Sequence, residues 1–102
     1  MTTPRTSKKG KALPLAFAAA LRRLADLDGM LVAGRATGVG SEALLAAMAE
    51  RTLHRRTFDR VVAYVAASLV RLGELPQGAG AAEAEIAAGK WAATQARERG
   101  LS

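Results

Sequence analysis

The chain has no cysteine among its 102 residues. This absence excludes disulfide scaffolds, thiolate metal sites and cysteine nucleophiles, and it is typical of a protein in the reducing cytoplasm. His54 is the only histidine, and Asp26 and Asp28 stand two residues apart on a predicted helix, where they point to different faces. We therefore expect a cytoplasmic protein with no metal site and no cofactor.

Residues that could form a catalytic centre are also scarce. No serine lies in the strand–turn–helix context of a hydrolase nucleophile, and His54 is expected to lie in an exposed turn. Glu83 and Glu85 are on an alanine-rich helix, where carboxylates usually face solvent. Residues 38–43 have the spacing of a dinucleotide-binding loop, but they follow a helical pattern instead of a strand and lack the lysine of a P-loop. We expect neither an enzyme nor a small-molecule substrate.

Long apolar runs are missing too. Arg22 and Arg23 interrupt the longest one, so no segment approaches the roughly 18 apolar residues of a membrane-spanning helix. Residues 8–21 are similar to a secretory signal, with basic residues before an apolar stretch. However, the helical spacing continues beyond the point where cleavage would occur, which favours one amphipathic helix. We expect no membrane partner.

The patterns that are present predict an all-α fold, a small single-domain bundle of about four helices over residues 12–102. Helical spacing of apolar residues and end signals at Pro14, Gly34, Ser41, Thr57 and Gly73 define these helices. Their predicted ranges are 14–32, 42–53, 57–72 and 81–99. The glycine-rich stretch 34–40 is predicted to be a loop, and no alternating pattern predicts a strand.

Aromatic residues number only four, whereas alanine occurs 24 times. The core is therefore expected to be thin, and a chain of this size buries only about 60 to 65% of its unfolded surface. The helix at 81–99 is the weakest, because Ile86 and Trp91 are its only large apolar residues. We expect these two residues to bind a larger protein assembly or a second copy of the chain.

The net charge of +6 is concentrated at the start of the chain. Four basic residues and no acidic residue occur in residues 1–11, which we expect to form a flexible basic tail. These residues are Arg5, Lys8, Lys9 and Lys11. The remainder of the chain is almost balanced in charge, and the tail is expected to add non-specific affinity for nucleic acid.

A second basic cluster lies where the helices at 42–53 and 57–72 meet. It consists of Arg51, His54, Arg55, Arg56 and Arg60. Two helices joined by about four residues have the outline of a helix-turn-helix, whose second helix would begin at Thr57. Arg51, Arg55, Arg56, Thr57 and Arg60 are therefore candidate nucleic-acid ligands, although the same arginines would also suit a solvated helix end or an acidic protein partner.

Two functions remain open. The first is a small helical subunit without enzymatic activity that assembles with other protein chains, including within a nucleoprotein complex. The alternative is a helix-turn-helix-like DNA-binding regulator that uses the arginine junction at 51–60 and the basic tail. The sequence does not distinguish DNA from RNA as the nucleic acid.

Overall fold

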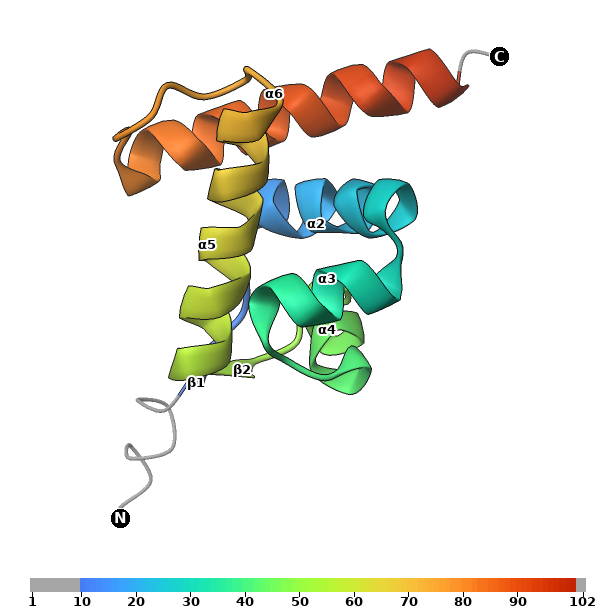
Figure 1. Ribbon diagram of the computed structural model, residues 1–102, viewed down its shortest axis with the longest axis vertical. Helices are drawn as coiled ribbons and strands as arrows, with labels where there is room; N and C mark the ends of the chain where they lie inside the picture. Colours follow the sequence, from blue (N-terminus) through green and yellow to red (C-terminus); the bar gives the residue numbers. More distant parts are fainter. Residues whose placement is uncertain (1–9, 101–102) are drawn as a thin grey trace.

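The computed structural model describes residues 10–100, which contain five helices and two very short strands (Figure 1). In chain order these elements are β1 (Gly10–Lys11), α2 (Leu15–Asp28), α3 (Met30–Thr37), α4 (Ser41–Met48), β2 (Leu53–His54), α5 (Arg55–Arg71) and α6 (Ala81–Gly100). The predicted small all-α fold is confirmed.

Helix α2 is the centre of the fold and contacts all four other helices. Phe17, Leu21 and Leu24 follow one another at helical spacing, and each is less than 5% exposed. Pro14 precedes the first turn, where its missing N–H costs no hydrogen bond, and its carbonyl accepts from the Ala18 N–H at 3.0 Å. The apolar face of α2 thus forms the middle of the core.

The helix predicted over 14–32 is in fact two helices. Gly29 has a φ of 91°, a conformation that costs little only for glycine. Its N–H closes α2 by donating to the Ala25 carbonyl, and its own carbonyl opens α3 by accepting from the Ala33 N–H. Helix α3 then runs on to Thr37, so most of the loop predicted over 34–40 is helical and only residues 38–40 form a turn.

The helix predicted over 42–53 is shorter than expected. It ends at Met48, and Glu50 follows in the left-handed region with a φ of 60°. The N–H groups of Glu50 and Arg51 donate to the carbonyls of Ala47 and Ala46, which is the pattern of a Schellman motif. Two of the last four carbonyls of α4 are satisfied in this way, and the chain leaves the helix axis.

Two short strands pair where no strand was expected. One strand comes from the end of the predicted tail, and the other lies at the end of the predicted helix 42–53. Gly10 lies opposite His54 and Lys11 opposite Leu53 in an antiparallel ladder. The expectation of no strand was therefore wrong, and the last two residues of the predicted flexible tail belong to the folded body. Arg5, Lys8 and Lys9 lie outside the described residues.

Helix α5 begins at Arg55, two residues before the predicted cap at Thr57. His54 is its N-cap, because the Nδ1 atom of His54 accepts from the Arg56 N–H at 3.2 Å. The buried face of α5 has the predicted period, with Val61, Val65 and Leu69 all fully buried. Its end at Arg71 lies close to the predicted end.

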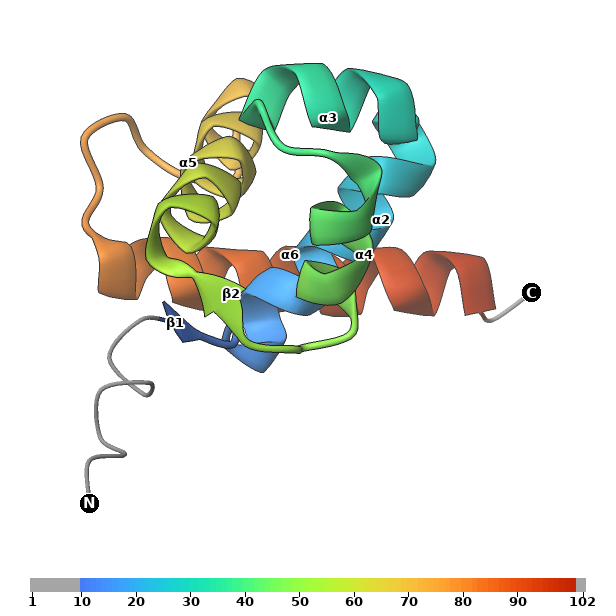
Figure 2. The same cartoon turned by 90° about the horizontal axis from the view of Figure 1, so that it is seen from below.

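Helix α6 packs against α2 (Figures 1 and 2). Most of its buried side chains are small. Ala84, Ala88 and Trp91 recur at helical spacing, and each is at most 5% exposed. The side chain of Trp91, which was predicted to bind a partner, is part of the core of its own chain. Ile86 lies on the other side of the helix and is 65% exposed.

A polar contact ties the end of α2 to α5. The Tyr64 hydroxyl donates to Asp28 Oδ2 at 2.6 Å, and Arg71 Nη2 lies 3.8 Å from the same oxygen. Burial raises the pKa of Tyr64 well above its ordinary value, and the hydrogen bond to Asp28 raises this pKa further. The neutral hydroxyl is therefore the form that the folded state stabilises.

Because the pKa of Tyr64 is higher in the folded state, its contribution to stability is complete below pH of about 10 and declines as the pH rises further. Tyr64→Phe is expected to lower the free energy of unfolding at neutral pH by about 1 to 2 kcal/mol and to reduce its decline at alkaline pH. Urea denaturation from pH 8 to 11 measures both effects. An unchanged alkaline decline in the variant would assign it to other groups.

Candidate nucleic-acid interface

Helices α3 and α4 are joined by the three-residue turn 38–40. Gly38 ends α3 in the left-handed conformation, with a φ of 76°, and its N–H donates to the Gly34 carbonyl. Ala33 and Leu44, one from each helix, are fully buried. Two short helices connected by a glycine turn have the outline of a helix-turn-helix.

The predicted helix-turn-helix was placed on α4 and α5, and residues 49–54, including β2, lie between those two helices. The link between α3 and α4 is a shorter turn. The sequence signal that could have located it was the pair Gly38 and Gly40 directly before Ser41. That signal was interpreted as part of a longer flexible loop because helix α3 was not expected to continue beyond Gly34.

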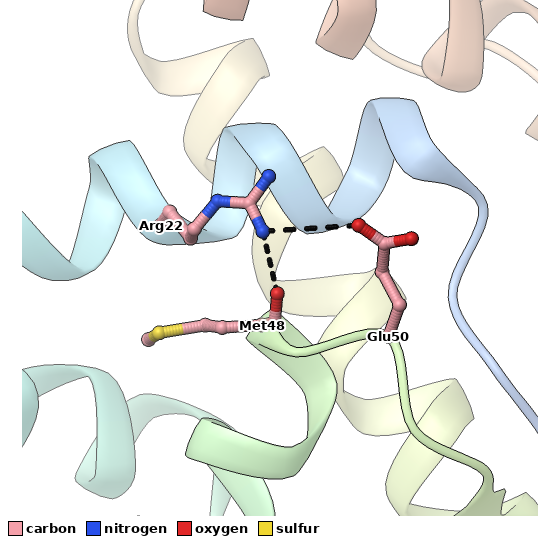
Figure 3. Close-up of polar contacts among 3 residues, drawn as sticks. All are labelled: Arg22, Met48 and Glu50. Carbon is pink, nitrogen blue, oxygen red and sulfur yellow. Dashed lines mark hydrogen bonds and ion pairs between the residues drawn. The ribbon is translucent and has the colours of Figure 1, made fainter.

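Two arginines fasten α4 to the rest of the fold. Figure 3 shows the Arg22 guanidinium, on α2, reaching the Met48 carbonyl at the end of α4 and the Glu50 carboxylate beyond it. At the other end, Arg60 Nη1 on α5 donates to the Gly38 carbonyl at 3.3 Å. Arg60, predicted to be a nucleic-acid ligand, is exposed but serves in part to hold the turn.

The arginines at the start of α5 and just before β2 make no such contacts. Arg51, Arg55 and Arg56 are exposed, and within residues 10–98 their guanidinium groups form no ion pair or side-chain hydrogen bond. Arg55 and Arg56 lie in the first turn of α5, which contains no acidic residue. Because a helix N-terminus is itself positive, this end of α5 is strongly attractive to anions.

Lys11 extends the same basic surface. Its Nζ atom lies 4.9 Å from the centre of the Phe58 ring, which is a cation–π distance. The pairing of β1 with β2 places Lys11 beside the start of α5, at the end of the molecule that also carries α4 (Figure 2). Lys11 therefore lies next to the arginines that begin α5, and Arg5, Lys8 and Lys9 precede it in the sequence.

Thr57, another predicted ligand, is half-buried.

The exposed face of α4 adjoins this basic surface. A hollow of about 520 Å³ is lined by Glu42, Leu45, Ala46, Ala49 and Arg51. Sequence reasoning did not identify the α4 residues as part of a site. We name the surface formed by α4, Arg51, Arg55, Arg56 and Lys11 the basic face.

A second surface feature lies between α5 and α6, around the predicted partner residue Ile86. It is a groove of about 260 Å³, whose lining includes Glu74, Leu75, Pro76, Glu83, Ile86 and Lys90. The groove has an apolar floor and both signs of charge at its rim. Its walls come from the loop after α5 and from the first turns of α6.

In the part of the chain that the structure describes, no three side chains of histidine, cysteine, aspartate or glutamate are grouped as metal ligands. None of the helices described is both long and apolar enough to cross a membrane. Comparisons with protein families, with curated proteins and with solved structures found no match to this chain.

Proposed function

We propose that this chain is a small, non-enzymatic DNA-binding module of the cytoplasm that docks the α3–α4 helix-turn-helix on a duplex. The observation that carries the proposal is a group of three exposed arginines without ion pairs: Arg51 lines the hollow on the second helix of that motif, and Arg55 and Arg56 begin α5. In a helix-turn-helix, the second helix enters the major groove while flanking groups contact the backbone. On this proposal α4, instead of α5, is the groove helix.

The three arginines would then bind backbone phosphates on either side of the major groove. Arg51 lies three residues after the groove helix, and Arg55 and Arg56 begin the next helix, where backbone N–H groups and the helix dipole add to their charge. Lys11 and the preceding basic residues would extend the contact along the backbone. Each neutralised phosphate releases counterions, so binding should weaken steeply with salt.

Fluorescence anisotropy of a labelled DNA duplex, titrated with the intact chain at two salt concentrations, tests the proposal. We expect binding at physiological salt, with an affinity that falls linearly on a double-logarithmic plot as salt rises. No binding at either salt concentration would overturn the proposed function. The residues responsible are identified by the substitutions argued in the Discussion.

The groove beside Ile86 favours a second candidate function, that of a helical subunit in a larger protein assembly or a homo-oligomer. An exposed isoleucine over an apolar floor with a charged rim has the composition of a small protein contact. The two functions are compatible, because the groove lies between α5 and the start of α6, whereas the basic face is built on α4 and the opposite end of α5.

A further inference from the structure

The groove helix offers few side chains that can distinguish bases. The exposed residues of α4 and its C-cap are Ser41, Glu42, Leu45 and Ala49. Bidentate recognition of guanine or adenine requires arginine, lysine, asparagine or glutamine, and this face has none of these between Ser41 and Ala49. Leu45, at its centre, is 57% exposed and has no hydrogen-bonding group.

The charged groups of the basic face are placed for phosphates instead of bases. Arg51 lies at the edge of the hollow on the exposed face of α4, three residues after the helix, whereas Arg55 and Arg56 belong to the first turn of α5. Glu42, in the first turn of α4, stabilises the helix dipole, but its carboxylate opposes nearby phosphates. Cationic contacts of this kind position a protein on a duplex without reading its sequence.

The structure also favours a double strand over a single strand. Single-strand binding without sequence preference relies on exposed aromatic rings that stack on bases. Here Phe17, Tyr64 and Trp91 are buried, and Phe58, the fourth aromatic residue of the chain, is half-buried with Lys11 over its ring. No open stacking platform exists among these four rings.

The shape of the motif favours DNA over RNA. A helix such as α4 fits the wide major groove of B-form DNA, whereas the major groove of an RNA duplex is deep and too narrow for it. The arginines alone would not make this distinction, because both duplexes present phosphates. It depends on α4 entering the groove far enough to bring Arg51 to the backbone.

Resting on the proposed function, we infer that the chain binds duplex DNA through its phosphates with little discrimination among base sequences, and in preference to single strands and RNA duplexes. The exposed residues of α4 enter the major groove without forming base-specific contacts. The partner is thus duplex DNA as a class and not one operator sequence.

Selection from a random duplex library, followed by anisotropy of the selected and unselected duplexes at equal length and salt, tests this inference. We expect affinities that differ by less than about tenfold, compared with at least about a thousandfold for sequence-specific proteins. A selected motif bound about a thousandfold more tightly would overturn the inference and leave the proposed function intact. Tighter binding of single-stranded DNA or duplex RNA would also overturn it.

A variant of the groove helix adds a second measurement. Glu42→Gln removes a carboxylate without changing side-chain shape, and we expect it to strengthen binding to every duplex by a similar factor of roughly two to five. Strengthening or weakening on some sequences only would show that Glu42 contacts a base, which contradicts the inference. Absence of binding to any nucleic acid, by contrast, would contradict the proposed function itself.

Discussion

Alanine at both Arg55 and Arg56 is expected to weaken binding to duplex DNA by on the order of 30-fold at physiological salt, from about 1 kcal/mol for each lost phosphate contact. The slope of the logarithm of affinity against that of salt should fall by roughly two, since each phosphate contact contributes about 0.9. Anisotropy titrations at several salt concentrations measure both quantities. The two side chains are exposed and form no ion pair within residues 10–98, so stability should change by less than about 0.5 kcal/mol.

The matched control is alanine at both Lys90 and Arg97, two exposed cations of α6 that lie outside the basic face. It removes the same charge from the chain, so it corrects for the general loss of attraction to a polyanion. We expect this control to retain most of the affinity and nearly all of the salt dependence. An arginine double variant that binds with unchanged affinity and slope would remove the basic face from the site.

Trp91→Ala is expected to lower the free energy of unfolding by about 3 to 5 kcal/mol. Trp91 is only 5% exposed and lies in the stripe of α6 that packs on α2 with Ala84 and Ala88. No larger neighbour in that stripe could fill the space that the indole leaves. Because small domains are stable by only about 5 to 15 kcal/mol, much of the population could unfold, which urea denaturation followed by circular dichroism would show.

Ile86→Ala on the same helix is the control for this substitution. Ile86 is 65% exposed, so the loss of its side chain should change the free energy of unfolding by less than about 0.5 kcal/mol. Ile86→Asp then tests the groove, because a buried carboxylate would disrupt any self-association seen by sedimentation. If Trp91→Ala left stability unchanged and abolished only assembly, the indole would be a partner contact after all.

The helical class could be predicted because it depends on local spacing. Phe17, Leu21 and Leu24 on α2, and Val61, Val65 and Leu69 on α5, repeat at the period of a helix and are buried as expected. Helix ends were less predictable. A single glycine within an apolar pattern is compatible with a continuous helix, and only the backbone angle of Gly29 shows that the chain turns there.

The buried face of helix α6 could not be predicted from the sequence, for a different reason. Its buried stripe contains alanine at positions 84 and 88, and alanine is equally common on exposed helix faces. The pattern of hydrophobic residues in α6 therefore hardly shows which face of the helix is buried. The close approach of α2 makes these small residues core residues, since a Cβ atom at Gly89 would lie 3.4 Å from the Ala16 side chain. Trp91 was assigned to a partner because this neighbour was unknown.

The sequence by itself determined the kinds of residue that make the basic face, an arginine cluster at 51–60 and a cationic start of the chain, because charge and composition are properties of single residues. The tertiary structure decided how they meet. Pairing of Gly10 and Lys11 with Leu53 and His54 brings Lys11 to α5, and packing in the core makes the glycine-rich segment the end of α3 and a short turn before α4. Both depend on contacts between distant residues, which local patterns do not encode.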